Sequence, residues 1–266
     1  MTSTSLPARN LGVIPQALRL FSLDFGRQLR ARKTLVLLAV QLLPVLVALA
    51  YVAFGQLDGM TMFRNSMESV YLPFLVPLAA LYFGGPAIVD EIEGRTITYL
   101  TLRPLPRALI YLAKLKSAML SALLVTSLPI ILLFGICAFS SGELLGELPT
   151  LGKMLGASAV GVLTYTAVFA MLAAIFSSSL LLGIVYYVIV EMVIAAIPVL
   201  ELVSIKFHVR TIAGLQGADR AGWLDRLILD EPLNFEWWFG LLVAAIFTTL
   251  ATAVATAIFR EKQFHV

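Results

Sequence analysis

Residues 34–54 read TLVLLAVQLLPVLVALAYVAF, a run without a single charged side chain. A helix needs about 20 predominantly apolar residues to cross the hydrocarbon core of a bilayer. Every backbone N–H and C=O in that core must be satisfied within the protein, and a helix achieves this by itself. The stretch is therefore predicted to be a membrane-spanning helix.

Five more runs of this kind follow along the chain. They cover residues 70–89, 117–139, 151–176, 179–200 and 238–259, and the last is rich in threonine but uncharged. The whole chain of 266 residues is 60% hydrophobic and only 13% charged, whereas soluble domains are about 25% charged. We predict an all-α membrane protein with six transmembrane helices.

The positive charges predict the orientation of these helices. Most of the 19 Lys and Arg residues fall on one side when both termini are placed in the cytoplasm, as the positive-inside rule expects. The predicted location is the cell (inner, cytoplasmic) membrane, as a multi-pass protein. The first apolar run starts too late and is too long for the core of a cleaved signal peptide.

Residues 1–33 are predicted to form a cytoplasmic N-terminal segment that ends in an amphipathic helix. Leu18, Phe21, Phe25 and Leu29 recur at helical spacing, while the arginines lie off that stripe. Such a helix fits an interfacial elbow leading into the membrane; the alternative is a short cytoplasmic helix that only shields charge. Residues 34–266 then form the six-helix transmembrane domain.

Charge interrupts the apolar pattern most densely at residues 90–116, DEIEGRTITYLTLRPLPRALIYLAKLK. Acidic residues end the second span, Gly94 permits a turn, and Pro104 and Pro106 restrict the exit. Arg107 and Lys114 then open the third span. This order predicts a short charged segment below the membrane that docks into a soluble partner, although an ordinary positively charged loop is the alternative.

Motifs for enzyme chemistry are missing from the chain. No GxxxxGK[ST] sequence is present to cradle nucleotide phosphates, so no ATPase activity is expected in this chain. Asp90, Glu91 and Arg95 come close to the EExxxR signature of an intramembrane protease family, but the histidines that such enzymes need are absent from the spans, because His208 and His265 lie outside them. No catalytic residue, metal site or nucleic-acid partner is expected.

Glu191 is the one carboxylate inside a predicted span. An ionised carboxylate at the bilayer centre costs about 2.5–3.5 kcal/mol on insertion scales, so Glu191 should face the bundle interior, a cavity or a partner chain. Two interpretations stay open: a polar site on the substrate route, or a hydrogen bond between helices. Thr164, Tyr165 and Tyr186 are candidate donors by residue type.

Three other patterns have weaker implications. Pro73, Pro77 and Pro86 predict a bent second span, either as a moving hinge or as a kink without a function. Small residues at four-residue spacing, Gly152 and Gly156 first among them, predict tight helix packing within one chain or between two. The long outer loop 201–237 is either a lid over the route or a passive connection.

The segment after the second span resembles that of the membrane subunits of ATP-binding-cassette (ABC) transporters of the type-2, mostly exporting, class. The matching positions are Glu91, Glu93, Gly94, Thr96, Ile97, Leu100, Pro104, Arg107 and Lys114, and Arg95 is inserted where many members join glycine directly to threonine. The layout of elbow, six spans, cytoplasmic termini and long last outer loop is also similar to that class.

This resemblance implies a permease subunit that works as a homo- or heterodimer on two ABC ATPase subunits. ATP and Mg would bind those ATPases, and this chain itself would carry no cofactor. Segment 90–116 would couple their closure to substrate translocation. The alternative is an energy-independent membrane protein, either a secondary transporter or an assembly scaffold. Secondary transporters often contain inverted repeats with broken helices in matching positions, and no such repeat is apparent here.

Overall fold

Helix is the only regular secondary structure in the part of the chain that the computed structural model describes, namely residues 13–54, 58–86, 106–142, 144–176, 179–197, 200–215 and 235–261. The all-α prediction is confirmed for these residues. Five helices are long and apolar enough to cross a membrane; they cover Arg32–Phe54, Gly59–Gly84, Arg107–Ser141, Leu148–Ile175 and Trp237–Arg260.

The fifth of the six predicted spans is present as a shorter apolar helix, Leu180–Ala196. It consists of α10 (Ser179–Tyr186), the π-helix η2 (Tyr187–Val193) and a 3-10 turn, η3 (Ile194–Ala196). The described part of the chain therefore contains five full-length spanning candidates, and six spans remain a prediction.

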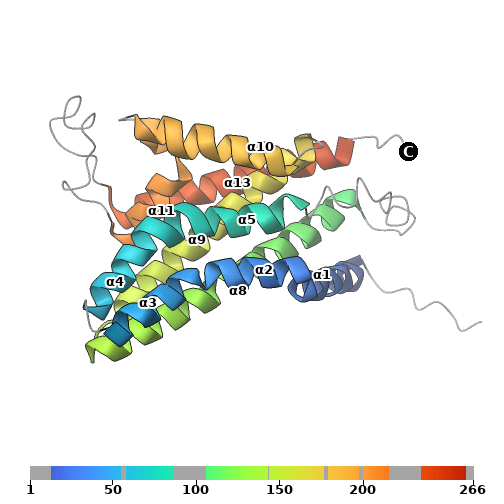
Figure 1. The fold of residues 1–266 in the computed structure, drawn as a ribbon. Coiled ribbons are helices and arrows are strands. Elements are labelled where there is room, and N and C mark those ends of the chain that lie inside the picture. Colours follow the sequence, from blue (N-terminus) through green and yellow to red (C-terminus); the bar gives the residue numbers. More distant parts are fainter. Residues whose placement is uncertain are drawn as a thin grey trace, which may run out of the picture.

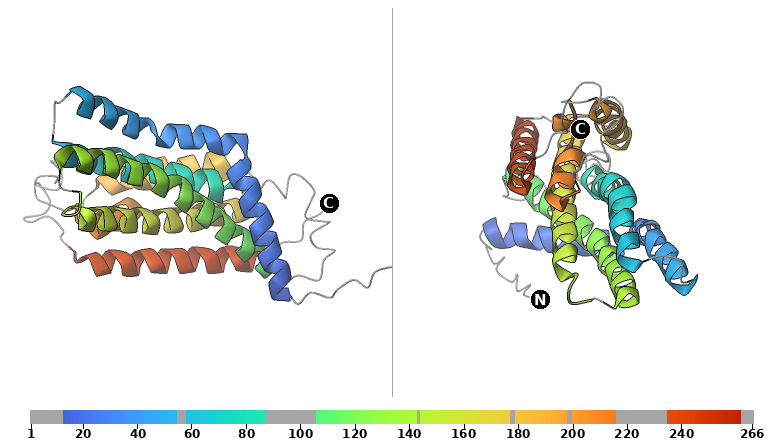
Figure 2. Two further views of the ribbon diagram at one scale, coloured as in Figure 1. Left: turned by 90° about the horizontal axis from the view of Figure 1, so that it is seen from below. Right: turned by 90° about the vertical axis from the view of Figure 1, so that its left-hand side faces the viewer.

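Helix α9 (Leu148–Ile175) lies at the centre of the bundle. It packs against α5 (Val76–Gly84) on one side and α13 (Trp237–Glu261) on the other, and the view along the bundle shows it between them (Figure 2). The long helix α8 (Arg107–Ser141) packs along α9 as well. Many large apolar side chains of α2, α3, α10 and α13 are exposed, as expected of helices that face lipid.

The first span is divided into α2 (Arg32–Gln41) and α3 (Leu43–Phe54), and α1 (Val13–Arg30) precedes it. Helix α1 runs across one end of the bundle rather than along it (Figures 1 and 2) and packs against α8. Phe21, Phe25 and Leu29 of the predicted stripe are half-buried, whereas Leu18 is exposed. We call this end of the molecule, where α1, the start of α8 and the end of α13 meet, the elbow end.

The second span is built from α4 (Gly59–Ser66), the π-helix η1 (Met67–Leu75) and α5. Pro73 lies inside η1. Pro77 has no N–H with which to satisfy the carbonyl of Pro73 in an α-helical register, and the hydroxyl of Tyr187 donates a hydrogen bond to that carbonyl instead. The π-helical segments of two different spans, η1 and η2, are thus joined directly.

A buried glutamine also donates a hydrogen bond to a main-chain carbonyl of this π-helix. Gln41 Nε2 donates to the carbonyl of Leu75 at 2.9 Å, and the Tyr71 hydroxyl donates to the carbonyl of Gln41 at 2.8 Å. Gln41 lies at the junction of α2 and α3, so these two bonds fix the break in the first span against the π-helix in the second.

Part of the predicted outer loop is helical. Residues 200–215 contain the 3-10 turn η4 (Leu200–Val203) and the helix α11 (Ile205–Ala213), which packs against α9 and α13. The rest of the loop, residues 216–234, lies outside the described residues. We call the end of the bundle that contains α11 the α11 end.

The rows of small residues differ in how closely other helices of the same chain pack against them. A Cβ on Gly152 or Gly156 would meet no atom within 4 Å, whereas one on Gly161 would lie 3.1 Å from Val76 and from Val209. In α13, the row Ala245, Thr249, Ala253 and Ala257 is exposed. Close packing within the chain therefore involves Gly161 and not the GxxxG pair.

Candidate functional site

The predicted coupling residues fall mostly outside the described part of the chain. These are Glu91, Glu93, Gly94, Arg95, Thr96, Leu100 and Pro104, within residues 87–105. Arg107 and Lys114 are described, and both belong to the first turns of α8. Segment 87–105 connects the end of α5 to the start of α8, so both of its flanks lie at the elbow end (Figure 1).

At the elbow end, Lys114 is buried against a carboxylate of α1. Its Nζ lies 3.8 Å from Asp24 Oδ1, and the two side chains are only 3% and 4% exposed. Asp24 also accepts hydrogen bonds from Arg27 Nη2 at 2.8 Å and Gln28 Nε2 at 2.7 Å. A buried charge is costly without a partner. This contact therefore ties α1 to the first turns of α8.

A second polar contact fixes the elbow to the second span. Thr34 Oγ1 donates to the carbonyl of Gln28 at 2.6 Å and lies 3.5 Å from the hydroxyl of Tyr82 in α5. The end of α5, the elbow and the start of α8 are therefore held together by Asp24, Thr34 and their partners. We call Asp24, Gln28, Thr34, Tyr82 and Lys114 the elbow junction.

At the α11 end, Glu191 is fully buried and its carboxylate binds the start of α11. Oε2 accepts hydrogen bonds from the Ser204 hydroxyl at 2.5 Å and from the Lys206 N–H at 3.1 Å, and Oε1 accepts one from the Ile205 N–H at 2.9 Å. The first N–H groups of a helix lack intrahelical partners, and negative charge is favourable there. A residue of η2 thus caps a helix that follows it in the chain.

Two cations of α11 meet groups of the spanning helices. Lys206 Nζ donates to the main-chain carbonyl of Glu191 at 2.9 Å. Arg210 Nη2 lies 2.9 Å from Glu68 Oε1 in η1, with both side chains largely buried. The helix therefore binds η1 through an ion pair and η2 through hydrogen bonds. We call Glu68, Glu191, Ser204, Lys206 and Arg210 the α11 latch.

His208 occupies the buried face of α11. Its Nε2 lies 2.8 Å from the carbonyl of Leu202, and its Nδ1 has no hydrogen-bond partner among the described residues. Burial lowers the pKa of His208 and is also the main cause that lowers the pKa of Lys206, because desolvation disfavours the charged form. Burial at this end of the bundle therefore disfavours the charged form of both side chains.

Glycine lets α11 approach its neighbours closely. A Cβ on Gly240 of α13 would lie 2.8 Å from the carbonyl oxygen of His208, which is closer than real Cβ contacts. Gly214 ends α11 with a φ of 70°, a backbone conformation that glycine adopts without a steric penalty.

Sequence reasoning selected Glu191 but not its partners. Thr164 instead donates to the carbonyl of Val160 at 2.9 Å and lies 3.1 Å from Thr248 Oγ1. The signal for α11 was present: Ser204 is a favoured N-cap residue, and Gly214 follows the helix where a C-terminal glycine is expected. Glu68 and Arg210 gave no signal, since they are 142 positions apart in the chain.

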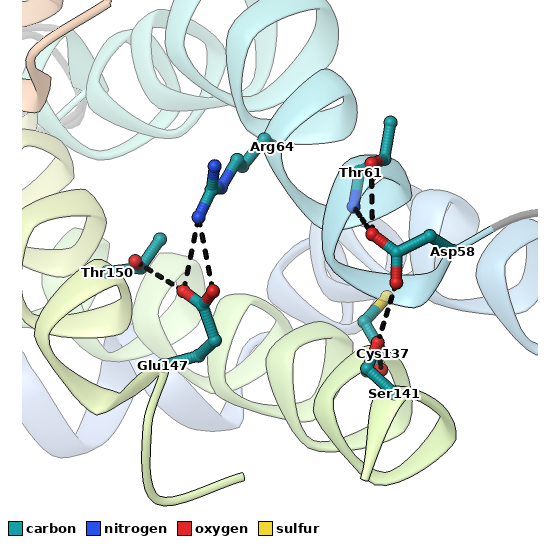
Figure 3. Close-up of polar contacts among 7 residues, drawn as sticks. All are labelled: Asp58, Thr61, Arg64, Cys137, Ser141, Glu147 and Thr150. Atoms are coloured by element: carbon teal, nitrogen blue, oxygen red, sulfur yellow. Dashed lines mark hydrogen bonds and ion pairs between the residues drawn. The ribbon is translucent and has the colours of Figure 1, made fainter. Parts of the chain in front are cut away.

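A third polar group lies where α4 meets α8 and α9 at the α11 end (Figure 3). Asp58 caps α4 by accepting from the N–H and hydroxyl of Thr61, at 3.2 and 3.0 Å, and accepts from the Ser141 hydroxyl at 3.1 Å. Arg64 Nη2 lies 3.2 Å from Glu147 Oε1. Asp58, Thr61 and Arg64 are exposed, whereas Ser141 and Glu147 are half-buried. Together they tie the ends of neighbouring spans to each other.

Metal-binding geometry is not found in the described ranges: no group of three His, Cys, Asp or Glu side chains there is placed to hold a metal ion. In a comparison with protein families, residues 29–196 match the family described as ABC-2 family transporter protein. No curated protein matches the chain.

Proposed function

Because this chain belongs to the ABC-2 family of transporter proteins, we propose that it is a permease subunit that moves its substrate with energy from a separate ABC ATPase, most simply as an exporter. The family match carries the proposal, since it covers residues 29–196 and so includes the predicted coupling segment 90–116. ATP and Mg belong to the ATPase in this proposal, and the present chain is not an enzyme.

Coupling is proposed to pass through the elbow end. Glu91, Glu93 and Arg107 make the contact with the ATPase, and Gly94, Arg95, Thr96, Leu100 and Pro104 shape the segment. Lys114 has a different role, because its side chain is buried and lies 3.8 Å from Asp24. It joins α8 to α1, so that a push on the segment moves α8 and the elbow together.

This arrangement requires the elbow end to lie on the cytoplasmic side of the inner membrane. The exposed cations Arg27, Arg30, Arg32 and Lys33 near the α1–α2 junction agree with the positive-inside rule. A labelling experiment with a membrane-impermeant maleimide on intact cells tests the orientation. A cysteine at Arg30 should be protected and one at Arg64 should react; the reverse pattern contradicts the proposal.

The second permease subunit is proposed to be an identical or related chain. The exposed row Ala245, Thr249, Ala253 and Ala257 and the open GxxxG pair are surfaces that allow close approach of a second helix. Native mass spectrometry of the complex from its own membrane would measure the stoichiometry, and a single copy of this chain would rule out the homodimer.

Co-purification tests the coupling directly. The variant Glu91→Gln/Glu93→Gln/Arg107→Ala should lose its ATPase, with a yield at least about tenfold below wild type, since a loss of ~1.4 kcal/mol in binding is a tenfold change. The complex is captured through the permease chain, and the ATPase is identified and counted by mass spectrometry.

A matched control removes the same kinds of charge at the opposite end of the bundle. Asp58→Asn/Glu147→Gln/Arg64→Ala alters the exposed group of Figure 3 and should retain the ATPase at the wild-type level. Equal retention by both variants would place docking outside the segment, and absence of any ATPase from the wild-type chain would favour an energy-independent protein.

A further inference from the structure

The exposed side of α1 carries arginines at a regular spacing. Four exposed side chains recur at helical intervals and form one row along the helix, namely Arg19, Leu23, Arg27 and Arg30. The exposed side chains of Arg32 and Lys33 follow at the start of α2. Asp24 is the only acidic residue of the described range 13–54, and it is buried. The exposed charge of this range is therefore entirely positive, and we call Arg19, Arg27, Arg30, Arg32 and Lys33 the elbow cations.

Large apolar side chains lie beside these cations on the exposed surface. Leu18 and Leu23 of α1 are 61% and 71% exposed, and Leu35 and Val36 near the start of α2 are 62% and 66% exposed. Leu35 and Val36 belong to the first candidate span. Helices that combine exposed leucines with Lys and Arg lie at the boundary between acyl chains and headgroups. The elbow cations are therefore expected at the depth of the lipid headgroups.

Arg27 joins this surface to the elbow junction. Its side chain is 68% exposed, yet its Nη2 lies 2.8 Å from Oδ1 of Asp24, whose side chain is only 4% exposed. Lys114 Nζ lies 3.8 Å from the same oxygen, and Gln28 Nε2 donates to the other carboxylate oxygen at 2.7 Å. An exposed cation and a buried cation thus share one oxygen. Arg27 can leave Asp24 without leaving a buried carboxylate unpaired, which is the costly event.

A lipid phosphate is a suitable acceptor for a guanidinium group that leaves this carboxylate. Arginine binds phosphate through paired, charge-assisted hydrogen bonds. Each cation near an anionic membrane surface also strengthens the attraction about fivefold. Zwitterionic headgroups offer the phosphate without the net charge, so a surface with several cations favours anionic phospholipids.

We propose that the elbow cations bind the headgroups of anionic phospholipids, and that a lipid phosphate takes Arg27 from Asp24, which then pairs with Lys114. The charge of the bilayer surface thereby acts on the contact that ties α1 to α8. This inference does not depend on an ATPase, because it requires only the chain and its membrane.

A fluorophore in place of Leu23 can report which lipids meet the row. Leu23→Cys is labelled with bimane, since Leu23 is exposed and the natural Cys137 is buried. The purified full chain is placed in phosphatidylcholine vesicles that contain spin-labelled phosphatidylglycerol or spin-labelled phosphatidylcholine. The association constant obtained from quenching should be at least about fivefold higher for phosphatidylglycerol, the gain expected from one cation. Equal constants would overturn the proposal.

A second labelled position shows whether the preference is local. Phe139 lies near the other end of α8 and is 83% exposed. The label on Phe139→Cys should be quenched nearly equally by the two lipids. A preference for phosphatidylglycerol as strong there as on α1 would mean that the whole protein attracts anionic lipid, which contradicts a site at the elbow.

Removal of the charges tests the row itself. Arg19→Gln/Arg27→Gln/Arg30→Gln should abolish the preference reported from Leu23→Cys, and high salt should reduce it in the unaltered row because ions screen exposed charges. Arg64→Gln/Lys153→Gln removes exposed cations elsewhere and should leave the preference unchanged. If the triple variant keeps its lipid preference but no longer retains an ATPase, the row binds a protein partner and the lipid proposal is wrong.

The exchange at Asp24 has a separate test. Asp24→Asn/Lys114→Met removes one charge of each sign, so the net charge stays the same. Arg27 then has no carboxylate to leave, and the preference for phosphatidylglycerol should increase, but not when Arg27→Gln is added. An unchanged preference would reject the exchange. Arg27→Gln alone alters only an exposed side chain and should lower the preference; if it does not, Arg27 is not a headgroup ligand.

Discussion

The accessory helices at the two ends of the bundle are attached with opposite charge patterns. At the elbow end, α1 brings the carboxylate Asp24 to a cation of a spanning helix, Lys114. At the α11 end, the π-helices η2 and η1 bring the carboxylates Glu191 and Glu68, and α11 supplies N–H groups and the cation of Arg210. At the elbow end the accessory helix supplies the carboxylate, whereas at the α11 end the accessory helix receives it.

This contrast indicates how firmly α1 and α11 are each attached to the bundle. Half-buried Phe21, Phe25 and Leu29 help α1 pack against the bundle, so Asp24 refines a contact that apolar burial already favours. Helix α11 is shorter and only part of its cap is local: Ser204 Oγ accepts from the Phe207 N–H, while Glu191 accepts from the N–H groups of Ile205 and Lys206. Removing a latch residue should therefore disturb the α11 end more than removing a junction residue disturbs the elbow end.

The largest effect is expected for Glu191→Ala. This change leaves the Ser204 hydroxyl and two N–H groups without their acceptor, at about 1–3 kcal/mol for each buried group. Amide hydrogen exchange of residues 205–213 should rise by orders of magnitude, while α1 and the start of α8 keep their protection. Glu236→Ala, which removes an exposed glutamate near the start of α13, is the control. Unchanged protection of α11 would show that apolar packing alone seats it.

The next largest effect is expected for Asp24→Ala, which leaves Lys114 buried without its carboxylate. The loss should be about 2–3 kcal/mol, somewhat below the 3–5 kcal/mol measured for breaking buried pairs, because the two atoms are 3.8 Å apart. Thermal unfolding of the purified complex measures it. Asp24→Ala/Lys114→Met should recover part of the loss, and Lys116→Met, at an exposed neighbouring position, should have little effect.

The sequence could predict the spans because their signal is local. Residues 34–54 carry enough apolar length to define a helix in lipid, and the boundaries differ from the structure by a few residues there. The third span was harder: α8 starts at Arg107, ten residues before the predicted apolar run, because Arg107, Lys114 and Lys116 interrupt the apolar residues of its first turns without ending the helix. Hydropathy finds the lipid-embedded part of a helix and not its full length.

The site was only partly predictable, for a physical reason. Glu191 stood out because a carboxylate in an apolar run is costly, but its partners depend on how the chain folds back after η2. Ser204 and Gly214 are local helix signals that bound α11, whereas the Glu68–Arg210 pair joins distant parts of the chain. No local pattern encodes such a pair.

A third prediction concerns the close approach of α13 to α11. Gly240→Ala would place a Cβ 2.8 Å from the carbonyl oxygen of His208, and overpacking of this kind costs about 1–3 kcal/mol. Gly156→Ala meets no atom of its own chain within 4 Å, and alanine favours helix by about 1 kcal/mol. Thermal unfolding should thus shift in opposite directions. A destabilised Gly156→Ala complex with normal subunit stability would instead locate Gly156 in an interface between subunits.

A smaller effect is expected for Arg210→Ala. Its side chain is 31% exposed and that of Glu68 is 15% exposed, so water screens part of the interaction and the loss should be about 1 kcal/mol. Hydrogen exchange should rise mainly in the last turn of α11, whereas Glu191→Ala should raise it over the whole helix. If both variants open the whole helix equally, α11 undocks as one unit, and the two contacts act as a single latch.

The smallest effect is expected at the exposed group of Figure 3, and it depends on pH. Hydrogen bonds, first of all from Thr61, lower the pKa of Asp58, and a hydrogen bond from Thr150 is the main cause that lowers the pKa of Glu147. A carboxyl whose pKa is lower in the folded protein stabilises it above the unfolded pKa, which lies near 4. That stabilisation is lost as the pH falls below about 4 and is constant between pH 6 and 8.

Asp58→Asn/Glu147→Gln removes these two titrating groups. Between pH 5 and pH 3 the thermal unfolding temperature of the variant should fall less than that of the wild type. At pH 7 the two should differ only slightly, because Asp58 is exposed and the ion pair of Glu147 with the exposed Arg64 is weak. Glu236→Gln serves as the exposed control and should follow the wild type. An equally steep acid transition in the double variant would mean that Asp58 and Glu147 do not set the acid sensitivity of the protein.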